Sequence, residues 1–337
     1  MRRAVVFGAA LGLALSAGAA SADPSPSMWE SAKDPGARAR EELHADMQRR
    51  IMLARLPLLR GVGQQTLDGA RVRLEEAGAR ESSDVRLRFD LGTVYELLDR
   101  HALARTVLSE ALAIAPDHTA AEDAWITLAF ACGKLGDHTC ERRAYNAFLA
   151  SATEDSHRVT AILNLAETEM HLGRLAEAID GYRDVMRICN GLPNAPGVQT
   201  TRALATWGLA VALDRHGDPI GALREAKLAV ERSGVDGMGL LRSPSVFYVP
   251  DYEVSWYEGL GAMAVAPTAK SATEAWDLWR FAERSFDRWI TGAEPKHDRW
   301  LPLARAHLAR AREERKRAEV RKAREPRPRV VDEDVTF

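Results

Sequence analysis

Three cysteines are the residues of this 337-residue chain with the clearest capacity for covalent chemistry. Cys132 and Cys140 lie four residues on either side of Gly136, so a hairpin that turns at this glycine would bring the two thiols together. An oxidising compartment would then allow a disulfide. Against the bond, disulfide geometry is demanding, and the equivalent of Cys140 in the next copy of the local pattern is the charged Glu177. The balance is against the bond, but the sequence leaves it open, with Cys189 unpaired.

The nine histidines show no spacing that is typical of a catalytic or metal site. Five of them fall at predicted turns or helix ends, where a histidine commonly faces water or caps a helix: His101, His118, His138, His171 and His216. The chain has no glycine-rich phosphate loop, no H-E-x-x-H and no G-x-S-x-G. We therefore predict that the protein is not an enzyme and that it binds no cofactor and no metal.

The elements that would position these groups are short amphipathic helices, and the clearest pair lies in Val85–His118. Gly92 and Ala104 are small, so two antiparallel helices can approach closely there. Larger apolar residues fill the seam between them: Tyr95, Leu108 and Leu112. Pro116 ends the second helix, because proline lacks an amide hydrogen and clashes with the preceding turn. One such hairpin cannot bury its apolar face alone, so copies are expected on both sides.

The same pattern recurs along most of the chain. Helix pairs are predicted near 37–84, 85–118, 122–151, 159–190, 203–233 and 252–290, with a capping helix at 300–311. In the first pair, Gly61-Val62-Gly63 is expected to break the helices apart, and the second helix to span Thr66–Ala77. In the fourth complete copy, Gly217 suits a left-handed helix end, Asp218 an N-cap, and Pro219 the first helical position.

The third pair has an ambiguous second helix. With a standard loop, Glu141 falls where the pattern has alanine; with a loop three residues longer, Ala144 and Phe148 take the places of Ala104 and Leu108. We favour the longer loop, because it also places Ala144 34 residues before Ala178.

The spacing of Leu91-Gly92, Tyr95, Ala104, Leu108 and Pro116 resembles the L-G-x2-Y…A-x3-F…P signature of the tetratricopeptide repeat (TPR). The resemblance covers about residues 51–234, and 252–310 only by analogy of helix pairs. Departures from the pattern are Arg88 for an aromatic residue, Asp99 for the turn glycine and Glu169 for tyrosine. The resemblance implies an all-α fold, a right-handed superhelical solenoid of antiparallel helix pairs, of an exported bacterial type.

The resemblance also implies a concave groove, lined by the first helix of each pair, that binds a helix or extended peptide of another protein. Carried over by register, the groove residues are Phe89, Asp90, Thr93, Ile126, Phe130, Leu163, Asn164, Glu167, Met170, Trp207 and Val211. Family members that hold chaperone tails grip a terminal carboxylate with a clamp of Lys, Arg and Asn, in which the places matched here are those of a Lys and an Asn. Phe89 and Thr93 stand in those places, so chaperone tails are not expected ligands.

Residues 1–22 have the pattern of a secretory signal peptide. Arg2 and Arg3 precede an apolar run, and Ala20-Ser21-Ala22 offers small residues for cleavage before Asp23. We predict a flexible lead-in at 23–36 and a periplasmic or secreted mature protein. The 46 basic and 48 acidic residues balance, without the clustered basic face that nucleic-acid binding needs.

Two later segments each allow two interpretations. Ser243–Val254 is either a loop packed over the array or a binding loop, and we favour packing. Trp276, Trp279, Phe286 and Trp289 share one helix face, which is either an aromatic ligand groove or a core seam. We favour the core, because the spacing is that of a buried face.

The C-terminal part, 312–337, is predicted to be a charged helix extension that projects or frays, followed by a disordered tail. Residues 312–329 contain nine bases and four acids, so contact with an anionic envelope surface is possible there. The favoured function is a non-catalytic scaffold or adaptor in the cell envelope. The alternative is a structural envelope component that this basic tail tethers. The partner and the oligomeric state do not follow from the sequence.

Overall fold

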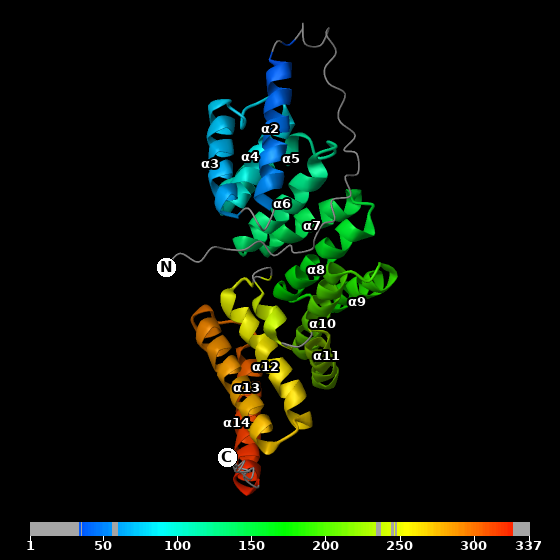
Figure 1. Cartoon of the computed structure of the whole chain (residues 1–337), viewed down its shortest axis with the longest axis vertical. Coiled ribbons are helices and arrows are strands. Elements are labelled where there is room, and N and C mark those ends of the chain that lie inside the picture. Colours follow the sequence, from blue (N-terminus) through cyan, green and yellow to red (C-terminus); the bar gives the residue numbers. More distant parts are fainter. Residues whose placement is uncertain are drawn as a thin grey trace, which may run out of the picture. The chain divides into compact units, whose positions relative to one another are not determined.

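The computed structural model describes residues 34, 36–55, 60–233, 237–243, 246 and 248–325, in which every regular element is a helix (Figure 1). The α-helices are α2 (Ala37–Arg55), α3 (Arg60–Glu76), α4 (Val85–Leu97), α5 (His101–Ile114), α6 (Ala121–Lys134), α7 (His138–Ser151), α8 (Asp155–His171), α9 (Leu175–Gly191), α10 (Pro196–His216), α11 (Pro219–Arg232), α12 (Val254–Val265), α13 (Ala272–Ala293) and α14 (Leu301–Arg324). Short 3₁₀ turns lie at η2 (Gly239–Arg242), η3 (Asp251–Glu253), η4 (Ala266–Thr268) and η5 (Glu294–Lys296). The predicted all-α fold of helix pairs is confirmed.

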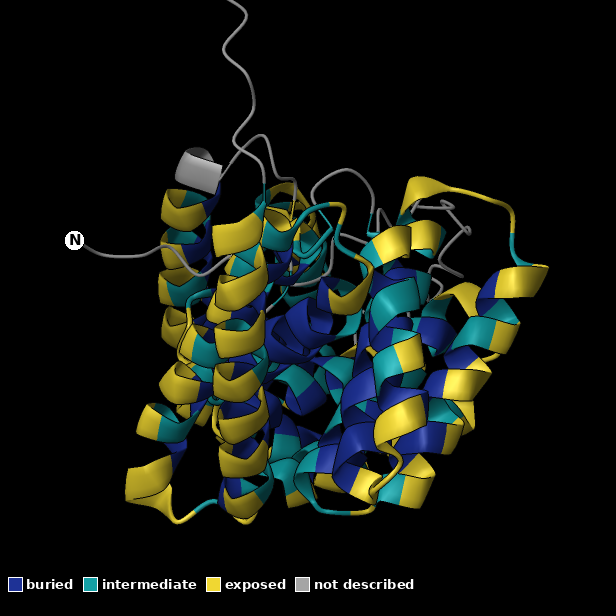
Figure 2. Cartoon of the chain, turned by 90° about the horizontal axis from the view of Figure 1, so that it is seen from below, coloured by how far each residue is buried: buried dark blue, intermediate teal, exposed yellow. Residues whose placement is uncertain are grey.

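Contacts divide the chain into two compact units: unit 1 up to Ala205, and unit 2 from Thr206, so the boundary falls inside α10. Within the helix pairs, buried faces turn toward one another and exposed residues line the outer faces (Figure 2). None of the helices in the described ranges combines the length and apolarity that a membrane crossing needs. The predicted signal segment, 1–22, and the last twelve residues, 326–337, lie outside the described residues.

The same type of backbone turn joins the two helices in each of four hairpins. The first helix ends in a residue of positive φ: Asp99 (57°), Gly136 (70°), Gly173 (80°) and Gly217 (90°). The next amide then donates back to a carbonyl in the last turn of the first helix: Arg100 to Tyr95, Asp137 to Cys132, Arg174 to Glu169 and Asp218 to Leu213, at 2.8–2.9 Å. This pattern satisfies helix-end carbonyls and favours glycine. The N-cap predicted at Asp218 is confirmed, because its side chain accepts from the Gly221 amide.

Small residues set the distance between α4 and α5, as predicted. A Cβ atom on Gly92 would lie 2.5 Å from Leu108 Cδ2, so only glycine lets the two helices come this close. Leu108 and Leu112 are buried in the seam. The close packing that the sequence predicts for this hairpin is therefore confirmed.

Two predictions about helix boundaries are wrong. Gly61-Val62-Gly63 does not break the chain, because α3 begins at Arg60. A Cβ on Gly63 would lie 3.2 Å from the Ala54 Cα, so this glycine serves close packing of α3 on α2.

The long loop in the third pair is also wrong. Three residues join α6 to α7, as they join α4 to α5. Glu141 does take the alanine place. It fits because a Cβ on Gly133 would lie 2.7 Å from the Glu141 Oε1, and glycine leaves that space open.

Aromatic residues build the core of unit 2. The Trp256 ring meets those of Trp289 (4.7 Å between centroids) and Phe286 (5.8 Å) edge to face. Trp279 is buried and Trp276 half-buried. The core-seam interpretation of α13 is therefore confirmed for Trp279, Phe286 and Trp289.

Buried polar groups pin the first and last helices of unit 2 together. Asp214 of α10 accepts hydrogen bonds from Trp256 Nε1 and from His307 Nε2 of α14, both at 2.9 Å. Beside them Arg215 donates to Glu253 (2.7 Å) and its guanidinium lies 4.6 Å from the Trp256 ring centroid. Each buried charge or polar atom named here has a partner that offsets part of its desolvation.

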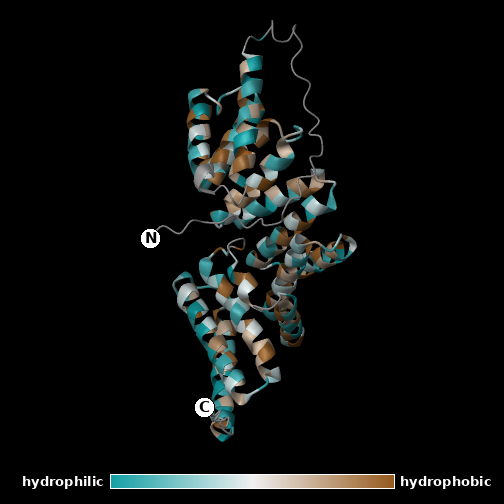
Figure 3. Ribbon diagram, viewed as in Figure 1, coloured by the Kyte–Doolittle hydropathy of each residue, from teal (hydrophilic) through white to brown (hydrophobic). Residues whose placement is uncertain are grey.

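The second half of α14 does not project or fray. Although α14 is largely hydrophilic (Figure 3), Ala304, Ala311 and Ala318 are buried at intervals of seven residues, the spacing of a seam between two long helices. The Lys322 ammonium lies 4.1 Å from the Trp276 ring, and Glu325 accepts from the Ala272 amide at the start of α13. In the second half of α14 the buried apolar residue is the small Ala318, whereas the first half also buries Leu301 and Leu308.

The described part of Ser243–Val254 packs, as favoured. Tyr248 is buried, and its ring lies 5.3 Å from that of Tyr257 on α12. Phe247 lies outside the described residues.

Candidate protein-binding site

The structure buries six of the eleven predicted groove residues: Phe89, Asp90, Thr93, Met170, Trp207 and Val211. A buried side chain offers no surface to a ligand, so in this structure these six are core residues rather than contact residues. The other five are half-buried: Ile126, Phe130, Leu163, Asn164 and Glu167.

Neighbouring helices explain the burial. Asp90 is 1% exposed, because α2 covers it; its carboxylate accepts from His44 Nδ1 (2.7 Å) and Gln48 Nε2 (2.6 Å). Burial raises the pKa of Asp90 despite these bonds. In unit 2, Trp207 donates from Nε1 to the Ser233 hydroxyl at 3.0 Å.

The five half-buried residues lie on α6 and α8, and we call them the α6–α8 face. Ile126 and Phe130 come from α6; Leu163, Asn164 and Glu167 come from α8. These helices are the first members of consecutive pairs, and α7 lies between them in the chain.

Tyr145 of α7 connects the two sides of the α6–α8 face. Its ring meets Phe130 edge to face at 6.3 Å, and its hydroxyl hydrogen-bonds the Asn164 side chain. Tyr145 is buried, and burial raises the pKa of its hydroxyl well above the usual value. The buried, neutral Tyr145 side chain therefore contacts both Phe130 and Asn164 and restricts their positions.

An imidazole pair borders the face on its polar side. The rings of His138 and His171 stack at 4.6 Å, nearly parallel. His138 Nδ1 lies 2.9 Å from a Glu141 carboxylate oxygen, and His171 Nε2 lies 3.9 Å from one of Glu167. Burial raises the pKa of Glu141, although the hydrogen bond to His138 opposes the shift. The two histidines belong to different hairpins, so their spacing in the sequence does not indicate that they meet.

The α6–α8 face and the two neighbouring histidines together contain three half-buried apolar side chains, an amide, a carboxylate and two imidazoles. In the described ranges, no group of three or more His, Cys, Asp and Glu side chains is placed to hold a metal ion.

A disulfide joins Cys132 of α6 to Cys140 of α7, with 5.8 Å between the Cα atoms. The prediction that Cys132 and Cys140 stay unbonded is therefore wrong. Glu177 is exposed at the equivalent position, as expected, but Cys140 is only 7% exposed, because its side chain turns onto Cys132. The bond closes the hairpin directly behind Phe130. Cys189 is free and buried.

Ion pairs neutralise part of the basic C-terminal stretch. Arg312 and Arg315 pair with Glu283 of α13, and Arg317 pairs with Glu313 and Glu314. The number of unpaired basic side chains on α14 that could contact an anionic surface is therefore smaller than the sequence implies. The residues from 326 to 329 lie outside the described part of the chain.

No family model matches the chain, and no curated protein matches it either. Solved structures that are similar to it include a tetratricopeptide repeat protein from Parabacteroides merdae, with 13% identity, a TM-score of 0.46, and coverage of 80% of this chain and 99% of that one. A putative kinesin light chain from Podosopora anserina with TPR-like repeats shows 17% identity, a TM-score of 0.42, and coverage of 64% and 97%. A STAND protein with a tetratricopeptide repeat sensor from Pyrococcus horikoshii shows 14% identity, a TM-score of 0.45, and coverage of 88% and 48%. With TM-scores below 0.5, these similarities carry no inference about function.

Proposed function

We propose that this protein is a non-catalytic scaffold or adaptor that binds a helix or peptide segment of another protein through the α6–α8 face. The observation that carries the proposal is the pairing of half-exposed apolar residues, Ile126, Phe130 and Leu163, with adjacent polar groups on two successive first helices. Apolar side chains held partly in water gain free energy when a partner covers them.

The rigidity of this face supports the same proposal. The Cys132–Cys140 bond fixes α6 to α7, and Tyr145 links α7 to Asn164 of α8. A surface that is already ordered loses little conformational entropy on binding, so more of the contact energy becomes affinity.

We further propose that the protein acts in the cell envelope or outside the cell. The disulfide supports this location, since such bonds persist mainly in oxidising compartments. The signal-like pattern before Asp23 agrees with it. Expression with and without residues 1–22, followed by fractionation and thiol counting, tests the location; a cytosolic chain with three free thiols would contradict it.

The binding proposal is tested by capture from extracts of the source organism on the tagged chain, with quantitative mass spectrometry. We expect Leu163→Ser and Glu167→Lys to remove a specific set of captured proteins. The matched control is Leu103→Ser on α5, because Leu103 is also a large apolar residue, is 44% exposed and lies outside the face.

Two results would overturn the binding proposal. One is retention of every captured protein by both face variants while their circular dichroism stays native. The other is an equal loss with the Leu103 control.

The alternative, an envelope component tethered by 312–329, ranks second because ion pairs occupy three of its bases. Deleting the segment would also remove the packing of α14 on α13. Reversal of exposed charges, Lys316→Glu with Arg321→Glu, is the cleaner test. Release from the membrane fraction would favour tethering.

A further inference from the structure

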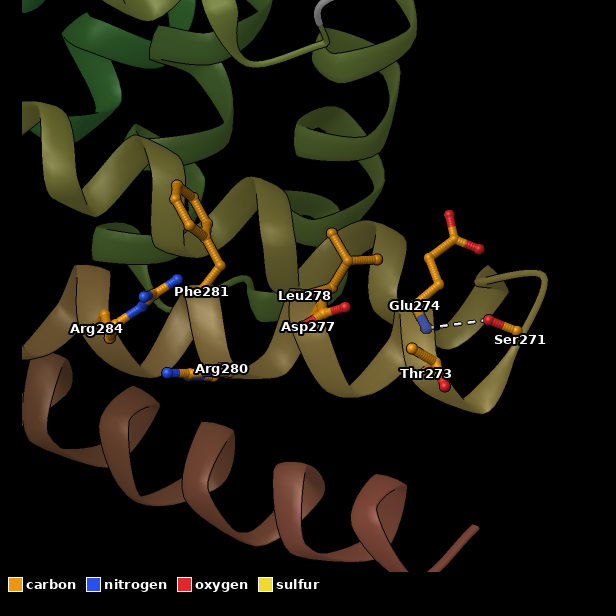
Figure 4. A pocket seen from close by; sticks show the side chains of 8 residues that line it. All are labelled: Ser271, Thr273, Glu274, Asp277, Leu278, Arg280, Phe281 and Arg284. Atoms are coloured by element: carbon orange, nitrogen blue, oxygen red, sulfur yellow. Dashed lines mark hydrogen bonds between the residues drawn. The ribbon is translucent and has the colours of Figure 1, made fainter. Parts of the chain in front are cut away.

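The outer side of α13 carries a second candidate interaction surface, made by Asp277, Leu278, Phe281 and Arg284, which we call the α13 face. An open pocket of about 530 Å³ lies over it. In Figure 4, Phe281 and Leu278 project from the same side of the helix, and α14 lies along a different side. Both apolar side chains are half-buried, so the fold of unit 2 leaves them partly in contact with water.

The charges on this face have no partners among the residues that the structure describes. Asp277 and Arg284 are exposed, and neither makes a hydrogen bond or ion pair with another described residue. Seven residues separate them, which is about 10.5 Å along a helix, so they cannot reach each other. Charged residues on other sides of α13 form ion pairs within the chain: Glu283 pairs with Arg312, and Arg288 pairs with Glu258.

The order of side chains along the α13 face is acid, apolar, apolar, base. A partner that matches it presents base, apolar, apolar, acid along the same line. A second copy of α13 presents that order when it runs in the opposite direction. A parallel second copy would place like charges together.

We propose that two copies of this chain associate through their α13 faces, with the two helices antiparallel about a twofold axis. Asp277 of each copy then pairs with Arg284 of the other. The axis passes near the midpoint of these two residues, so the two Phe281 side chains meet beside it. One patch is thus complementary to itself, as twofold interfaces require.

The size of the face implies a weak, reversible dimer. Exposed ion pairs each contribute little, and one helix face buries less area than a standard stable interface. Association is therefore expected to depend on protein concentration and to weaken with salt, which screens exposed charges. This inference is independent of the binding role of the α6–α8 face.

Sedimentation velocity of the purified full chain over a wide concentration range tests the proposal. We expect a monomer–dimer equilibrium whose dissociation constant rises between about 0.05 M and about 0.5 M salt. Asp277→Arg or Arg284→Asp alone reverses both symmetric pairs and weakens the dimer by about tenfold or more. The double variant exchanges the two charges in both copies and restores it.

Asp180→Arg on α9 is the matched control, because it changes the net charge equally at an exposed site of unit 1. It is expected to leave the dimer unchanged. A wild-type chain that stays monomeric, single reversals that dimerise normally, or a double variant that is not restored would each overturn the proposal. The first result would assign the α13 face to a different protein.

Discussion

Replacing Glu96 by Gln is expected to make the protein less sensitive to alkaline pH. Glu96 is on α4 and only 3% exposed, and its Oε1 has no hydrogen-bond partner among the described residues. His101 Nδ1 lies 3.9 Å from this oxygen. Burial raises the pKa of Glu96 to about 8, although Lys134 and Arg55 lower it in part. Burial lowers the pKa of His101, so both groups are mainly neutral at pH 7.

The sign of the effect follows from proton binding. Because the pKa rises from 4.5 to about 8 on folding, the folded state holds a proton that the unfolded chain releases. This contribution to stability is complete below pH 4.5 and is lost as pH rises through 8. Between pH 7 and pH 9 the linkage predicts a loss on the order of 1 kcal/mol for the wild type. Glutamine is neutral throughout and removes this loss.

Urea unfolding of both proteins at pH 7, 8 and 9 measures the difference. We expect the difference in free energy of unfolding between Glu96→Gln and the wild type to widen by on the order of 1 kcal/mol over this range. Glu110→Gln is the control. Glu110 forms a surface ion pair with Arg80, which lowers the pKa of Glu110. The difference in free energy of unfolding between Glu110→Gln and the wild type therefore stays constant above pH 7. Parallel curves for Glu96→Gln and the wild type would show that the carboxyl is already ionised, and would refute the reasoning.

Two sets of substitutions and one deletion probe packing. Replacing Cys132 and Cys140 by alanine should lower the free energy of unfolding by about 2 to 3 kcal/mol, the value for so short a loop, and reduction of the wild type should match it in thermal unfolding. Gly92→Ala should cost about 1 to 3 kcal/mol through overlap with a leucine of α5, whereas Gly191→Ala, which meets nothing within 4 Å, should be nearly neutral in the same assay. Deleting 312–337 should cost more than about 2 kcal/mol in tryptophan-monitored unfolding, because α14 packs on α13; an unchanged transition would contradict that packing.

Local chemistry made the hairpins predictable. A turn of this type needs a residue that tolerates positive φ. The sequence indicates such turns by the glycines Gly136, Gly173 and Gly217. Asp99 takes the same conformation without being glycine, and only the repeat register pointed to it. The alanine that the pattern asks for at 141 is missing, and the compensating Gly133 lies on the partner helix, where a search along one helix does not find it.

Burial depends on neighbours that the repeat pattern does not encode. The register places Asp90 and Trp207 on a groove face. In the structure Asp90 is hydrogen-bonded to His44 and Gln48, and Trp207 donates a hydrogen bond to Ser233. The α13–α14 seam was missed for a related reason. Alanines spaced by seven give almost no hydrophobic signal, although they allow two helices to lie close together.

The two proposed faces can be separated experimentally because each lies within one unit. The α6–α8 face is held by the Cys132–Cys140 bond and Tyr145 of unit 1, and the α13 face by the aromatic core of unit 2. Asp277→Arg should therefore leave the affinity of a single α6–α8 face for its partner unchanged. A dimer, however, carries two such faces, so a partner with several binding segments would be held more tightly by the dimer than by the monomer. If Asp277→Arg weakens capture of a multivalent partner but not of a single isolated segment, the α13 face acts through avidity. If it weakens both equally, the two faces are not independent.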